Sequence, residues 1–170
     1  MAERWQHGVV AVVAAATLTA CGPDAPRPTP DPDRTSMSTA TPAAKNGTGE
    51  ERHDLAPLTK RFSRLGEPVA ATWYSGTLGS DRAPGPTSYW IDAVVELEPA
   101  TVKELVAQFS PEPVDTTPDV VDDLEPALPA GELIGSKQLS EAFSSAGFST
   151  TAWLDVTGRR LVLTAKGQGS

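Results

Sequence analysis

The feature that most limits what this chain can fold into is a proline-rich stretch between residues 22 and 54. It holds six prolines, seven serine or threonine residues and one bulky apolar residue, Met37. Such a stretch cannot bury enough apolar surface to offset the entropy that ordering would cost. We therefore expect residues 22–54 to form a disordered, partly polyproline-like tether. A hydrophobic core is left to residues 55–170, which suffice for one domain and are too few for two.

An apolar run precedes this tether and ends at the only cysteine of the chain. Residues 8–19 are apolar but short of the roughly 20 residues that a membrane-spanning helix needs. The tetrapeptide Leu18-Thr19-Ala20-Cys21 closes a segment with the three-part form of a secretory signal. It resembles the lipobox of bacterial lipoproteins. The Ala-, Thr- and Pro-rich, acidic style of the chain is also similar to small lipoproteins of actinomycetes.

The resemblance implies a signal peptide over residues 1–21 and a lipid on Cys21, which would become the mature N-terminus. The lipid would be a diacylglycerol thioether, whose two acyl chains satisfy the two-signal requirement for stable anchoring. The body would then lie on the outer face of the bacterial cytoplasmic membrane. Two alternatives remain, an ordinary secreted protein with a free cysteine and a short buried helix with a chance cysteine. A lone thiol has no partner in an oxidising compartment, which favours the lipoprotein.

The hydrophobic periodicity of residues 55–170 predicts an α+β fold. The expected helices cover residues 55–65, 99–109 and 139–146, and the expected strands cover residues 69–78, 89–98, 152–156 and 160–166. The last two strands read as a hairpin that places Leu154 opposite Leu161 and Asp155 opposite Arg160. We therefore predict an antiparallel four-stranded sheet with helices packed on one face, in the order α-β-β-α-α-β-β.

Two expected strands carry the same Trp-apolar-Asp triplet. Trp90 and Asp92 flank Ile91, and Trp153 and Asp155 flank Leu154. Alternation turns the apolar residue inward and the Trp and Asp outward. If helices cover one face only, these four outward residues form a ligand-binding patch suited to a sugar ring, a cation or a peptide. The alternative is that residues 110–131 fold over this face and bury the rings in a second core.

Several chemistries are excluded by the residues that the expected domain lacks. The two histidines of the chain, His7 and His53, lie in the expected signal and tether, and Cys21 is the only cysteine. Residues 55–170 therefore lack the side chains for Ser-His-Asp or Cys-His catalysis and for His/Cys zinc sites. No nucleophile-elbow, P-loop or dinucleotide-binding motif is present. We expect a protein without cofactor or metal that is not an enzyme.

Acidic residues are the remaining candidates for chemistry. Asp92, Glu96 and Glu98 share one strand face, and a carboxylate pair is all that glycoside hydrolysis needs. Six further carboxylates lie between residues 112 and 125 and could collect Ca²⁺, although their spacing matches no EF-hand loop. In both cases solvated surface charge is the more ordinary interpretation.

The charge balance limits the partners. The expected domain has nine basic and fifteen acidic residues, which argues against nucleic acid. Two hypotheses of function remain. The chain is a tethered binding module that meets an envelope protein or glycan, or it is a small carboxylate-dependent hydrolase of cell-wall glycans. The missing nucleophiles favour the binding module. The ligand, the partner and the oligomeric state stay open.

Overall fold

A single antiparallel sheet of seven strands organises the residues that the computed structural model describes, which are 44–47, 50–79, 87–145 and 147–168. The strands are β1 (Lys45–Gly47), β2 (Ala70–Leu78), β3 (Ser88–Glu96), β4 (Glu112–Pro113), β5 (Ile134–Gly135), β6 (Phe148–Asp155) and β7 (Arg160–Gln168). The helices are α1 (Leu55–Arg61), α2 (Pro99–Phe109) and α3 (Lys137–Phe143), with 3₁₀ turns η1 (Ser63–Leu65) and η2 (Asp122–Ala127). Cys21 and the predicted anchor lie outside the described residues.

The prediction of a four-stranded sheet is wrong. The strand order is β1-β2-β3-β7-β6-β5-β4, in which four long strands form the centre and three strands of two or three residues extend the edges. These short strands have compositions that are depleted in sheets, such as Lys-Asn-Gly in β1 and Glu-Pro in β4. They pair because a neighbouring edge offers backbone partners. Periodicity cannot reveal a strand of two or three residues.

The folded part begins before Leu55, inside the stretch expected to be tether. β1 pairs with β2, and Arg52 forms an isolated bridge to Trp73. Two backbone hydrogen bonds of 3.0 and 2.9 Å make that bridge. His53, expected in the tether, lies against β2, where its Nδ1 is 3.0 Å from the carbonyl oxygen of Ala71.

The predicted hairpin register is confirmed. β6 and β7 pair with Leu154 opposite Leu161, Asp155 opposite Arg160 and Trp153 opposite Val162. The start of α2 is also as expected, because Pro99 stands at the first helical position, where a missing N–H costs nothing. α3 begins at a serine cap, Ser136, whose hydroxyl oxygen accepts a hydrogen bond from the Leu139 N–H.

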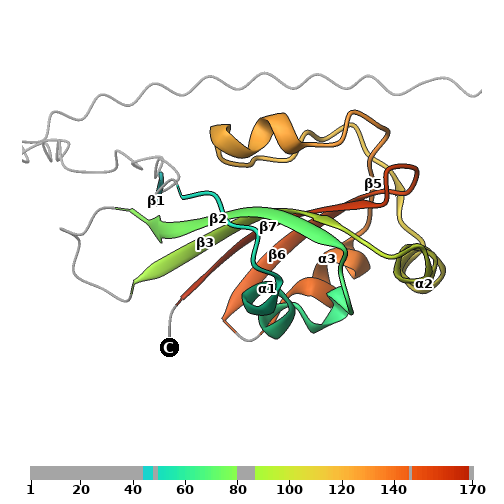
Figure 1. Ribbon diagram of the computed structural model, residues 1–170, viewed down its shortest axis with the longest axis horizontal. Helices are drawn as coiled ribbons and strands as arrows, with labels where there is room; N and C mark the ends of the chain where they lie inside the picture. Colours follow the sequence, from blue (N-terminus) through green and yellow to red (C-terminus); the bar gives the residue numbers. More distant parts are fainter. Residues whose placement is uncertain (1–43, 48–49, 80–86, 146, 169–170) are drawn as a thin grey trace, which may run out of the picture. The chain divides into compact units, whose positions relative to one another are not determined.

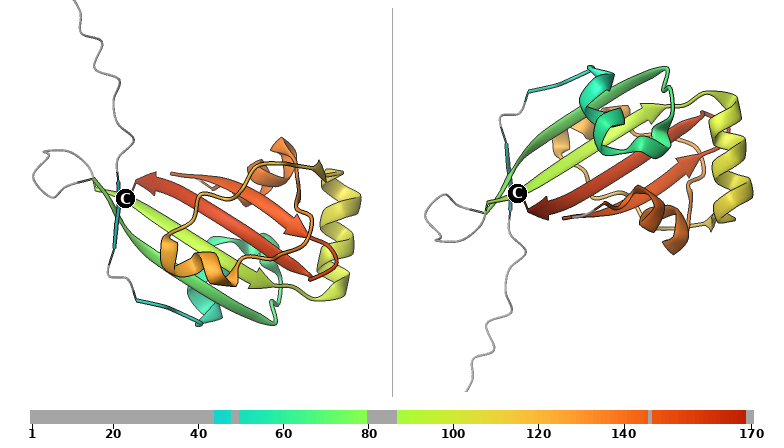
Figure 2. Two further views of the ribbon diagram at one scale, coloured as in Figure 1. Left: turned by 90° about the horizontal axis from the view of Figure 1, so that it is seen from above. Right: turned by 90° about the horizontal axis from the view of Figure 1, so that it is seen from below.

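All three α-helices pack on one face of the sheet. Figure 2 shows α1 and α3 against this face and α2 across the ends of the strands. Their apolar side chains meet those of the central strands in the larger of two cores. Leu58, Val102 and Leu139 are its contributions from α1, α2 and α3, and each is at most 5% exposed.

The opposite face is also covered. The segment between α2 and α3 runs over it with η2 as its helical part (Figures 1 and 2). A second core forms there from seven buried residues: Tyr74, Trp90, Val94, Val120, Leu124, Trp153 and Val162. The sheet is therefore the middle layer between two cores.

Candidate functional site

The four residues predicted to form an open ligand-binding patch are buried. Trp90 and Trp153 are 2% and 8% exposed, and Asp92 and Asp155 are 0% and 5% exposed. Val120 and Leu124 from the covering segment pack in the same cluster as the two rings. The expectation of an open patch is therefore wrong. The alternative, in which the segment buries the rings in a second core, is confirmed.

The two triplets do not form one site. Trp90 lies opposite Lys166 of β7, whereas Trp153 lies opposite Val162 of the same strand. Four residues along a strand correspond to about 13 Å. Asp155 has a local role, because its Oδ1 accepts a hydrogen bond of 2.9 Å from the Gly158 N–H in the turn between β6 and β7.

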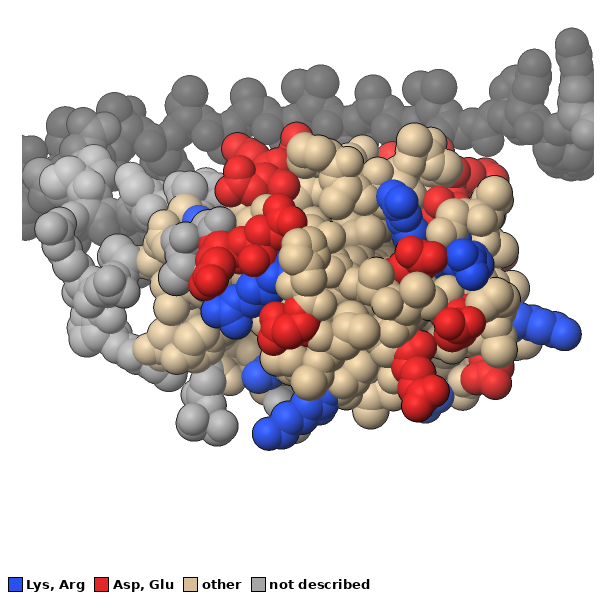
Figure 3. Space-filling model, viewed as in Figure 1, with Lys and Arg blue, Asp and Glu red and all other residues tan. Residues whose placement is uncertain are grey.

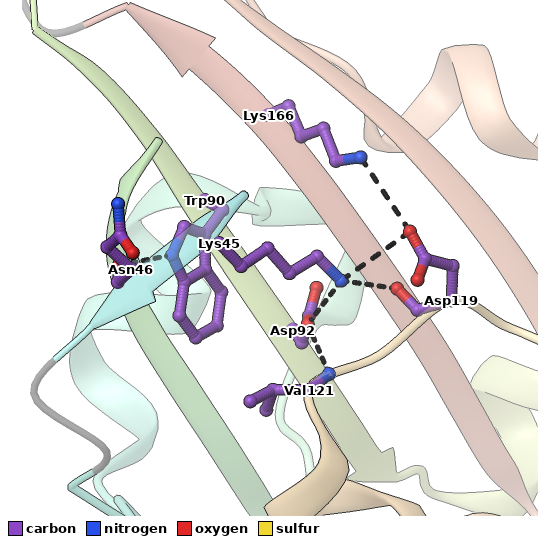
Figure 4. Close-up of polar contacts among 7 residues, drawn as sticks. All are labelled: Lys45, Asn46, Trp90, Asp92, Asp119, Val121 and Lys166. Atoms are coloured by element: carbon purple, nitrogen blue, oxygen red, sulfur yellow. Dashed lines mark hydrogen bonds and ion pairs between the residues drawn. The ribbon is translucent and has the colours of Figure 1, made fainter. Parts of the chain in front are cut away.

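Asp92 is the buried centre of a polar cluster that reaches the surface at Asp119 (Figure 4). Its Oδ2 accepts a hydrogen bond from the Lys45 ammonium group and another from the Val121 N–H, both at 2.8 Å. The same ammonium group donates to the backbone carbonyl of Asp119 and lies 3.8 Å from its carboxylate. Lys166 approaches that carboxylate from β7, also at 3.8 Å.

Trp90 completes the surroundings of Lys45. Its indole N–H donates a 2.6 Å hydrogen bond to the carbonyl oxygen of Asn46 in β1. The Lys45 ammonium group lies 5.9 Å from the centre of the Trp90 ring, within the range of a cation–π contact. We call the set Trp90, Asp92, Asp119 and Val121 the ammonium site.

The charge on Asp92 is only partly compensated. Burial raises the pKa of its carboxyl group, while the hydrogen bond and charge of Lys45 and the Val121 N–H act in the opposite direction. Its second oxygen, Oδ1, is buried and has no hydrogen-bond partner among the described residues. A buried acceptor without a donor is costly. Lys45 and Val121 therefore satisfy one of the two carboxylate oxygens of Asp92 and leave the other without a donor among the described residues.

The carboxylates considered for glycan hydrolysis do not meet around a common space. Asp92 is enclosed, and Glu96 forms an ion pair of 3.1 Å with Arg159. Glu98 is exposed at the residue before α2. The side chains that flank a scissile glycosidic bond must face one cleft, and these three do not.

The acidic segment shows no cation site. Asp122, Asp123 and Glu125 are exposed on η2, and Figure 3 shows acidic side chains over this part of the molecule. Within the described residues, no three acidic, histidine or cysteine side chains lie close enough together to hold a metal ion.

One surface groove lies between α2 and the turn that joins β6 to β7. Its volume is about 540 Å³. One stripe of α2 and the turn line it, with the apolar residues Pro99, Val102, Val106, Ala107 and Val156. Val156 is 44% exposed. Lys103 and Arg159 are the charged residues of the groove lining, and both are cationic.

Sequence reasoning missed both the groove and the role of Lys45. The sequence predicts the helix over residues 99–109, but it does not show that one side of this helix faces the turn between β6 and β7. Lys45 lies within residues 22–54, for which the composition predicts a tether. No local pattern links it to Asp92, which is 47 residues away. In comparisons with known proteins, no family model, no curated protein and no solved structure matches the chain.

Proposed function

We propose that this chain is a lipid-anchored binding module of the bacterial cell envelope. The lipobox-like tetrapeptide ending at Cys21 supports the anchor, and residues 22–43 would serve as the spacer. None of the helices in the described part of the chain has the length and hydropathy of a membrane span. In this proposal the membrane is reached through the lipid.

The observation that carries the binding role is the groove beside α2. Its volume of about 540 Å³ is in the range of ligand-binding sites, about 300–1,000 Å³. A strongly exposed valine, Val156, stands beside it in an otherwise polar turn. A concave surface lined mainly by apolar side chains is the usual form of a ligand-binding site.

The charges of the groove favour an acidic, apolar peptide segment as the occupant. Both charged lining residues are cationic, on a chain whose net charge is −8. Arg159 already pairs with Glu96, whereas Lys103 has no ion-pair partner among the described residues. A helix stripe with an apolar floor and a cation at its rim fits a segment with apolar anchors and a nearby carboxylate.

The glycan hydrolase that the sequence left open gains no support. Its best carboxylate, Asp92, is enclosed by protein and bound to Lys45. The binding module therefore remains the preferred function.

The anchor is tested by mass and by fractionation. The processed chain should begin at Cys21 and carry the mass of a diacylglycerol group, and it should sediment with membranes. Cys21→Ser should leave the protein unlipidated and remove it from the membrane fraction. A wild-type protein of unmodified mass would rule the anchor out.

The groove is tested with an anionic apolar probe, 8-anilinonaphthalene-1-sulfonate. The full chain should bind it saturably, with an increase in fluorescence. Val156→Ser and Lys103→Glu should each weaken binding by about tenfold, which corresponds to about 1.4 kcal/mol. Val69→Ser is the matched control, because Val69 is 47% exposed and does not line the groove. Equal effects of Val69→Ser and Val156→Ser would refute the groove as a binding surface.

A further inference from the structure

β1 contacts the rest of the sheet in the way that a bound peptide does when it adds a strand to a sheet edge. It contributes three residues, Lys45, Asn46 and Gly47, which pair with Leu78, Thr77 and Gly76 of β2. Extended peptides that join a sheet edge gain affinity from main-chain hydrogen bonds and specificity from alternate side chains. Here the side chain of Lys45 enters the ammonium site, while the carbonyl oxygen of Asn46 accepts the Trp90 indole N–H.

All four residues of the ammonium site lie outside β1. Trp90 and Asp92 come from β3, and Asp119 and Val121 come from the segment before η2. The Val121 N–H holds Asp92 Oδ2 in place independently of Lys45. Removing β1 would leave a preformed anionic acceptor beside an aromatic ring. These are the groups that recognise an ammonium ion.

Lys45 fills this site incompletely. Asp92 Oδ1 is buried without a hydrogen-bond donor among the described residues, although the Asp92 side chain is only 1% exposed. The Lys45 side chain itself is 14% exposed, so the site has an opening to solvent. An ammonium group has three N–H donors. A ligand that supplied a donor to Asp92 Oδ1 would remove the cost of this unpartnered acceptor.

We propose that the ammonium site and the adjoining edge of β2 form a recognition site for an extended peptide segment that carries a lysine, and that β1 is its intramolecular occupant. A partner segment displaces β1, pairs with β2 and places its lysine against Asp92. This site is separate from the groove beside α2, so a failure of the groove would not affect it.

β1 is suited to exchange. It has only three residues, and Asn and Gly are poor strand formers. Its advantage over a free peptide is the effective concentration that its covalent link to the domain provides. The acidic chain also attracts basic segments before contact.

The first experiment is peptide competition monitored by hydrogen–deuterium exchange. The full chain is mixed with a capped peptide that has the sequence of residues 43–47, Ala-Ala-Lys-Asn-Gly. The chain's own amides at residues 44–47 should exchange faster as the peptide reaches millimolar concentration, while β2 stays protected. The control peptide has norleucine in place of lysine. Equal effects of the two peptides, or none from either, would refute the proposal.

The second experiment removes the internal competitor. In the full-chain variant Lys45→Met, the lysine peptide should bind at least about tenfold more tightly than it binds the wild type. Adding Asp92→Asn should abolish that gain, whereas adding Lys137→Met should preserve it, because Lys137 pairs with Glu141 within α3 and not with the ammonium site. A gain that survives Asp92→Asn would show that the peptide binds elsewhere. If Lys45→Met does not fold, the competition on the wild-type chain decides the proposal alone.

Discussion

Truncation of Leu124 tests whether the segment over the second face is a structural cover. Leu124 is fully buried in η2 and packs in the cluster that contains Trp90 and Trp153. Leu→Ala substitutions in cores cost about 2–5 kcal/mol, through lost burial and the cavity that remains. We expect about 3 kcal/mol here, in the middle of that range, because η2 is a short surface turn that can partly collapse onto the cavity.

The assay is urea unfolding of the full chain followed by circular dichroism. With a denaturant slope of about 2 kcal/mol/M, a loss of about 3 kcal/mol lowers the midpoint by about 1.5 M urea. Acrylamide quenching of tryptophan fluorescence should rise at the same time, because two of the four tryptophans lose their cover. Leu128→Ala is the control in the same segment. Leu128 is half-buried, so it should lose about half as much.

A loss below about 1 kcal/mol with unchanged quenching would refute this reasoning. The segment between α2 and α3 would then contribute no core. Trp90 and Trp153 would then be accessible to ligands on the open face of the sheet.

The other predictions concern the polar contacts and the turn. Lys45→Met and Asp92→Asn should each lower the free energy of unfolding measured with urea. The loss in the double variant should be about 1–3 kcal/mol smaller than the sum of the two single losses, and additive losses would show that the pair is uncoupled. Because burial raises the pKa of Asp92 in the folded state, its contribution to stability should be fully present below the unfolded pKa of about 3.9 and should be lost as pH rises through the folded pKa. Wild type should therefore lose unfolding free energy relative to Asp92→Asn as the pH rises above the unfolded pKa of about 3.9, and parallel profiles would contradict the raised pKa. Gly158→Ala should lower the free energy of unfolding by about 1–3 kcal/mol, because the new methyl group would overlap the Asp155 carboxylate. Gly131→Ala should cost less, because a methyl group there would lie 3.1 Å from the oxygens of the same carboxylate. Equal melting temperatures for the two variants would count against this packing.

The parts of the fold that could be predicted from the sequence are those with a long, regular pattern. The strand around Ile91 alternates over most of its length, and its two faces do enter two different cores. The hairpin register follows from complementary pairs such as Asp155 and Arg160. In these cases local residues determine the geometry.

The parts that could not be predicted depend on contacts between distant residues. Alternation showed that Trp90 and Ile91 face opposite ways, but it cannot show whether both faces are covered. The cover depends on Val120 and Leu124, two buried residues in a proline-rich segment whose pattern predicts mostly loop with one or two helical turns. Likewise, Lys45 becomes part of a strand through its pairing with β2 and its contact with Asp92, whereas the composition around it predicts a tether.

The position of β1 also determines where tension would act on this fold. If the chain is anchored at Cys21, as we propose, a pull on that anchor reaches Lys45–Gly47 before any other described element. β1 pairs with β2 over three residues, whereas β2 and β3 pair over nine. β1 would therefore detach at a lower force than the central strands, and the chain between the anchor and the core would lengthen without unfolding the core. The same event would empty the ammonium site, so that stretching the tether would make Asp92 available to a partner's lysine.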